Sequence, residues 1–185
     1  MTNWTEWLGD SARAITGCDF QGTKVAEAAQ ILIAAATSDN PILICGNGGS
    51  AADAMHFSAE LVGRYRKNRR AIRAMALGAD PAILTAWAND HDFSEIFTRQ
   101  IEAHAKKDGV LVAISTSGRS ENVRNSIVAA SACGMKTIGL TGAAGFPDIE
   151  PHVEIRVPSK FTPLIQQAHI CIIHYLCQRI EDAIA

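Results

Sequence analysis

The sequence has little net charge, and its apolar runs are short. Its 185 residues carry a formal net charge of −2 at pH 7, so there is no overall basic field to hold nucleic acid. The longest apolar runs, such as ILIAAA, are far too short to cross a bilayer. The first residues show no basic segment followed by an apolar one, which argues against a secretory signal. A cytoplasmic protein with no membrane partner is the simplest expectation.

Paired cysteine motifs are also missing. The chain has five cysteines, an odd number, and none of them form a CxxC pair. This excludes an obvious disulfide framework or thiolate zinc site and predicts reduced, packed thiols. With 48% hydrophobic and 19% charged residues, the composition is typical of a folded globular protein of one domain.

Short apolar segments alternate with longer helical ones, which predicts βαβ units and a mostly parallel sheet. We expect an α/β three-layer sandwich in which helices flank a five-stranded sheet. The predicted single domain, 1–185, comprises N-terminal helices in 1–40, an α/β core in 41–160 and a C-terminal helix in 161–184. Ser50 is the expected N-cap of the helix that follows the first strand. The predicted strands are 41–46, 71–77, 109–116, 136–142 and 153–157.

The first glycine-rich loop, GNGGS, lies between a predicted strand and a predicted helix. Gly46, Gly48 and Ala51 formally match the dinucleotide fingerprint GxGxxG/A. That fingerprint expects an acidic residue about twenty positions later, where this chain has Arg69 and Arg70. A tight turn alone explains one or two of the glycines, so the loop does not predict a nicotinamide enzyme.

The second loop, STSGRS, has four hydroxyl residues among six, also between a strand and a helix. The first N–H groups of a helix lack partners within it, so such a loop suits a phosphate. The chain has no GKS or GKT, which excludes an ATP-type P-loop. Helix capping remains an alternative for any one serine, but the set favours a phosphate monoester such as a sugar phosphate. Both loops are expected at the carboxyl edge of the sheet.

A His/Glu pair and the last predicted helix supply candidate metal ligands. His56 and Glu60 are one helical turn apart, although a surface pair without chemistry is the alternative. Gln166 and His174 lie roughly 80° apart on one face of the last helix. Two imidazoles, a carboxylate and an amide resemble a catalytic zinc site. His169 lies about 140° from His174, which predicts a structural role for it.

From about Pro41 to Glu181 the chain resembles the phosphoheptose isomerases of the SIS (sugar isomerase) family. The residues that carry the resemblance are GNGGSAADAMH, the pair Asn89-Asp90, STSGRS, and IQQAH with His174. The resemblance implies a flavodoxin-like SIS domain that converts sedoheptulose 7-phosphate to D-glycero-D-manno-heptose 7-phosphate through an enediol. It also implies cytoplasmic homotetramers with active sites at subunit interfaces. Their product supplies activated heptose for bacterial lipopolysaccharide or other surface polysaccharide.

The resemblance further implies roles for individual residues. Glu60 and His174 match the catalytic pair. The implied metal, usually zinc, would be held by His56, Glu60, Gln166 and His174. The implied substrate contacts are Asn47, Gly48, Gly49, Glu60, Asn89, Asp90, Ser115, Thr116, Ser117, Ser120 and Gln166.

The chain departs from the family pattern at Gln167, where a glutamate is usual, and at His91, which follows Asn89-Asp90.

Three rival functions compete with isomerase activity. A non-enzymatic SIS protein lacks the second histidine of the last helix, and His174 is present here. SIS regulators carry an attached DNA-binding domain, for which this chain has no room. The basic run 64–70 could bind nucleic acid, but a solvated or interface-lining face is the preferred interpretation. Arg64 could reach a neighbouring active site in an oligomer.

Overall fold

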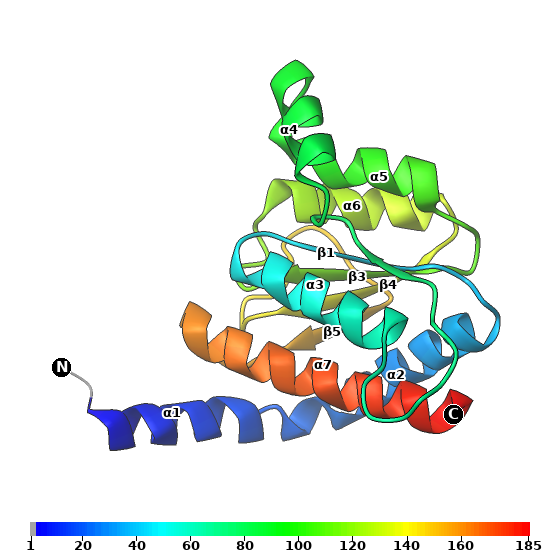
Figure 1. The fold of residues 1–185 in the computed structure, drawn as a ribbon. Coiled ribbons are helices and arrows are strands. Elements are labelled where there is room, and N and C mark those ends of the chain that lie inside the picture. Colours follow the sequence, from blue (N-terminus) through cyan, green and yellow to red (C-terminus); the bar gives the residue numbers. More distant parts are fainter. Residues whose placement is uncertain (1–2) are drawn as a thin grey trace.

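The computed structural model describes residues 3–185, and in that range five strands form one sheet (Figure 1). The strand order is β2-β1-β3-β4-β5, and every neighbouring pair is parallel. The predicted α/β sandwich is therefore confirmed, and the sheet is wholly rather than mostly parallel. The strands are β1 Ile42–Gly46, β2 Ala74–Ala76, β3 Val110–Ser115, β4 Lys136–Thr141 and β5 Val153–Arg156.

Helices cover both faces of the sheet (Figure 1). α5 and α6 pack over one face, whereas α2, α3 and α7 cover the other, and α1 runs along α7. The helices are α1 Trp4–Thr16, α2 Gly22–Thr37, α3 Gly49–Val62, α4 Pro81–Asp90, α5 Ile96–His104, α6 Glu121–Ala132 and α7 Thr162–Ile184, with short 3-10 turns at Asp19–Gln21 and Phe93–Glu95. Within the described residues, no helix combines the length and apolar character needed to cross a membrane.

The central strands are buried along their whole length because both faces carry apolar side chains. β1 reads ILICG and β3 reads VLVAIS, and every residue in both is buried. Such continuous apolar runs are typical of parallel strands covered on both sides. Parallel strands end at one edge, so the loops after β1 and β3 emerge together there, as the sequence predicted.

The start of α3 differs from the sequence prediction. The helix begins at Gly49, Gly48 is its N-cap with φ of 55°, and Ser50 lies inside the first turn with its side chain buried. The predicted capping role of Ser50 is therefore wrong, because the left-handed backbone at Gly48 already starts the helix. A Cβ on Gly46 would lie 2.6 Å from the Ser50 carbonyl oxygen, so this strand end must be glycine for α3 to pack so closely.

His169 is fully buried where α7 meets the end of β4, which supports its expected structural role. Its Nε2 donates to the Thr141 carbonyl oxygen at 3.2 Å. Its Nδ1 is buried and has no partner among the described residues. Burial lowers the pKa of His169 from 6.5 to about 4 because a charged imidazole there would lose its hydration.

Stability should therefore fall in acid. His169 is neutral in the folded protein, so protons bind the unfolded chain preferentially below its ordinary pKa. The free energy of unfolding should decrease by about 3 kcal/mol as the pH falls from 6.5 to about 4. Urea unfolding across this range would measure the loss. His169→Gln can still donate to Thr141 but cannot titrate, so it should show a flatter pH profile; equal slopes in both proteins would contradict the prediction.

Candidate active site

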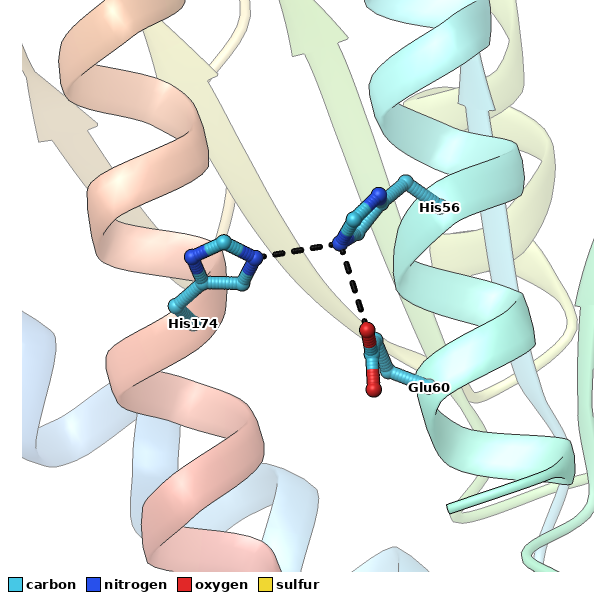
Figure 2. A group of neighbouring side chains, drawn as sticks. All are labelled: His56, Glu60 and His174. Carbon is cyan, nitrogen blue, oxygen red and sulfur yellow. Dashed lines mark hydrogen bonds and ion pairs between the residues drawn. The ribbon is translucent and has the colours of Figure 1, made fainter. Parts of the chain in front are cut away.

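His56, Glu60 and His174 converge between α3 and α7 (Figure 2). His56 Nε2 lies 3.0 Å from His174 Nε2 and 3.4 Å from Glu60 Oε1. One ligand atom from each side chain lies within 4.8 Å of the others. The one-turn spacing in α3 and the packing of α3 against α7 thus bring together two segments that are 118 residues apart.

The cluster is reachable from solvent. The His56 side chain is 44% exposed and that of Glu60 is 23% exposed, so a substrate or ion can approach both. The Tyr65 ring lies with its centroid 5.9 Å from that of His174 and backs the imidazole. Sequence reasoning missed Tyr65 because it belongs to the basic run, not to either predicted ligand helix.

The donor set suits a divalent metal ion. Two imidazole nitrogens and a carboxylate oxygen are ligands that zinc and its neighbours prefer. Tetrahedral bonds of 2.0–2.1 Å hold ligand atoms about 3.3 Å apart. The observed separations of 3.0 Å and 3.4 Å are close to that spacing before any ion is added. The residues present therefore fit such an ion.

Gln166, the fourth predicted ligand, lies beside His56. Both line a hollow of about 420 Å³, together with Asp53, Gln167 and neighbouring residues. A Cβ on Gly49 would lie 2.2 Å from Gln166 Nε2, so the glycine lets the first turn of α3 pass directly against this amide. The amide thus lies against the backbone of Gly49 and faces the same hollow as His56. Its bond to a metal stays a prediction.

The two loops are joined by an amide pair. Asn47 Nδ2 donates to Asn122 Oδ1 at 2.8 Å, and Asn122 Nδ2 donates back to Asn47 Oδ1 at 3.0 Å. Asn122 was not predicted, and its place two residues after Ser120 was the only signal in the sequence. This pair holds the carbonyl and amide of Asn47 in one orientation at the carboxyl edge of the sheet.

The hydroxyl loop is folded back on itself before α6. Ser115 Oγ donates to Ser120 Oγ at 3.3 Å, and the Arg119 N–H donates to Ser117 Oγ at 3.2 Å. The Thr116 carbonyl accepts from the Gly142 N–H at 3.1 Å, which ties this loop to the one after β4. The hydroxyl loop therefore leads directly into the N-terminus of α6, where N–H groups favour an anion, and Ser120 is the N-cap.

Asn89 and Asp90 lie elsewhere. They are the last two residues of α4, which protrudes beyond α5 on the side of the sheet opposite α7 (Figure 1). Both are exposed, and the Asn89 amide donates to Asp90 Oδ1 at 2.8 Å. Within one copy, α4 packs mainly against α5 and the turn Phe93–Glu95 rather than against α3 and α7, which carry the His/Glu cluster.

Comparison with known proteins places the chain in a family. The SIS domain model matches residues 6–142. The chain is 48% identical over 178 residues to phosphoheptose isomerase of Rhodospirillum rubrum, covering 96% of this chain and 89% of that protein. The chain belongs to the phosphoheptose isomerase family of SIS domains. The fold agrees with the phosphoheptose isomerase GmhA from Neisseria gonorrhoeae, with a TM-score of 0.87, 37% identity and 96% of each chain covered. It also agrees with a phosphoheptose isomerase from Francisella tularensis, at a TM-score of 0.89, 32% identity and 96% coverage of each chain.

In this phosphoheptose isomerase family member, the basic run has a role that the sequence did not predict. The Arg69 side chain is only 2% exposed, and its Nε lies 3.7 Å from Oε1 of the buried Glu181. The expectation of a solvated or interface-lining face is therefore wrong for Arg69. Glu181 lies two turns after His174 on α7, and that spacing was the available signal for a second residue on the same face.

Proposed function

We propose that this chain is the isomerase that converts D-sedoheptulose 7-phosphate to D-glycero-D-manno-heptose 7-phosphate, a step that supplies activated heptose for surface polysaccharide. The observation that carries the proposal is the convergence of His56, Glu60 and His174 in a member of this family. The hydroxyl loop at the start of α6 supplies the anchor for the remote phosphate.

The reaction moves a proton between two adjacent carbons and another between their oxygens. Glu60 is the proposed base that takes the carbon proton to give an enediol, and it returns that proton to the neighbouring carbon. His174 moves the proton between the two oxygens. Carboxylates and imidazoles perform such transfers near neutral pH when they are positioned beside the reacting atoms.

A divalent cation, zinc by the donor set, would be held by His56, Glu60, Gln166 and His174 and would polarise the two reacting oxygens. Glu60 then has two roles to reconcile, since a carboxylate bound to zinc is a weaker base. Asn47, Gly48 and Gly49 would contact the sugar, whereas Ser115, Thr116, Ser117 and Ser120 would hold its phosphate.

The proposed assembly is a cytoplasmic homotetramer whose active sites include residues of neighbouring copies. Trp4, Leu8 and Ile15 form an exposed apolar stripe on α1, at spacings that keep them on one helix face. Such a stripe is typical of a surface that another protein chain covers. In this assembly Asn89 and Asp90, from the protruding α4, would reach the site of an adjacent copy.

The direct test is turnover of sedoheptulose 7-phosphate by the purified protein, with the aldose product detected by NMR. We expect conversion with divalent metal supplied and without nicotinamide or ATP, because neither loop is built for those cofactors. Absence of turnover under these conditions, or dependence on either nucleotide, would contradict the proposed function. Light scattering on the same sample would measure whether the particle is a tetramer.

A further inference from the structure

The C-terminal end of α3, which carries Glu60, is closed by the side chain of Arg69. Arg69 Nη2 donates to the Glu60 carbonyl oxygen at 2.6 Å, and Nη1 donates to the Leu61 carbonyl oxygen at 2.8 Å. Nη1 also lies 2.9 Å from the Arg70 carbonyl oxygen and 3.4 Å from that of Gly63. One guanidinium thus contacts the backbone both before and after the helix end.

This end of α3 needs an external donor. The last carbonyls of any helix have no partner within it, and a left-handed glycine often closes the end. Here Gly63 has φ of −77°, outside the left-handed region, although its N–H donates to the Ala59 carbonyl oxygen. The next two carbonyls, of Glu60 and Leu61, are the ones that Arg69 binds. The planar fork of a guanidinium can hold two such oxygens at once, which an ammonium does less well.

Arg69 is in turn held by α7. Its Nε forms an ion pair at 3.7 Å with Glu181, whose side chain is 1% exposed. Glu181 also accepts the backbone N–H groups of the segment after α3, namely Tyr65 at 3.2 Å, Arg66 at 3.0 Å and Lys67 at 2.9 Å. The contact therefore fixes the end of α3 and the following loop against one point on α7.

The two helices joined in this way are the two that carry the candidate active site. His56 and Glu60 belong to α3, and His174 lies two turns before Glu181 on α7. We propose that Arg69 is a positioning residue of this site: by binding the Glu60 carbonyl and Glu181 together, it sets the separation of Glu60 from His174. The kinetic test of this inference rests on the proposed function. The metal-binding test rests only on the cluster of His56, Glu60 and His174.

Arg69→Lys is the first test, because it keeps the charge and loses the fork. A misplacement of about 1 Å in a catalytic group costs about 100-fold in rate. We therefore expect a fall in kcat of about 10- to 100-fold with KM nearly unchanged, since the phosphate-binding loop is untouched. Cobalt(II) titration of the metal-free protein should show weaker binding and an altered visible spectrum.

Arg66→Lys is the matched control. Arg66 belongs to the same loop and its Nη1 also reaches α7, at Gln178 Oε1 and 3.1 Å, but that contact is exposed. The kcat and cobalt(II) spectrum of Arg66→Lys should match those of the unaltered protein. If Arg69→Lys also matches the unaltered protein in both measurements, the proposal is overturned.

A second variant separates positioning from stability. Arg69→Met combined with Glu181→Gln removes both buried charges while Gln still accepts the loop N–H groups. It should regain most of the urea midpoint that Arg69→Met alone loses, because no unpaired charge remains. Its kcat and cobalt(II) affinity should stay low. If kcat and cobalt(II) affinity recover together with the urea midpoint, Arg69 acts only on stability and the inference is overturned.

The two proposals fail in different ways. If the unaltered protein does not turn over the sugar phosphate, the proposed function is wrong, and the cobalt(II) comparison still tests Arg69. If the unaltered protein is active and Arg69→Lys keeps its kcat and its cobalt(II) binding, only the role of Arg69 is wrong.

Discussion

Glu60→Gln is expected to lower kcat by about 10²- to 10⁴-fold, the usual contribution of a positioned base. The substitution keeps the size of the side chain but removes its charge and its basicity. Sugar phosphate binding should persist, because the substitution leaves the proposed anchoring loops at Asn47 and Ser115–Ser120 untouched. Steady-state kinetics together with direct binding of the sugar phosphate would measure both effects.

His56→Ala is the control that separates a base from a ligand. It removes a ligand atom 3.4 Å from Glu60 Oε1 without removing the proposed proton acceptor. Excess zinc should therefore restore part of the activity of His56→Ala, whereas the low kcat of Glu60→Gln should not rise at any zinc concentration. Metal content must be measured for each variant. Equal rescue of the two variants by zinc would mean that Glu60 is a ligand only.

Glu181→Ala should destabilise the protein by about 3–5 kcal/mol, the usual effect of removing one partner of a buried ion pair. Arg69 would keep its charge with 2% of its side chain exposed and no anion beside it. The N–H groups of Tyr65, Arg66 and Lys67 would lose their acceptor as well. The midpoint of urea unfolding, with its slope, would measure the loss.

Asp182→Ala provides the matched comparison. Asp182 is the next residue on α7 and pairs with Lys67 at 3.0 Å, but both side chains are about half exposed. A solvated ion pair contributes little, so this variant should unfold close to the unaltered protein. If the two variants lose similar stability, the buried environment of Glu181 does not have the effect proposed for it.

Local patterns predicted most of the fold. The apolar runs at 41–46 and 109–116 were predicted to be strands, and the structure confirms both as β1 and β3. The one-turn spacing of His56 and Glu60 followed from helix geometry. The predicted start of α3 was wrong because Ser50, a hydroxyl residue, was preferred as the N-cap. The helix instead begins after Gly48, whose positive φ is readily adopted by glycine.

Contacts between distant segments were harder to predict. Asn47 and Asn122 are 75 residues apart, and nothing local to either asparagine indicates that their amides pair. Arg69 looked like one of several solvated cations, because its burial depends on where α7 crosses α3. Asn89 and Asp90 have a motif-like pattern, but their place at the end of α4, which protrudes on the side of the sheet opposite α7, depends on the whole fold.

The pairing of α3 with α7 also sets the order in which the site matures in the cell. His56 and His174 are 118 residues apart, so at ordinary translation rates a ribosome makes the second imidazole about 6 to 24 s after the first. During that interval strands β2 to β5 are synthesised, but α7 is not yet complete. An ion that needs both imidazoles therefore has no complete site on the nascent chain, and its capture comes after the last helix has folded into place.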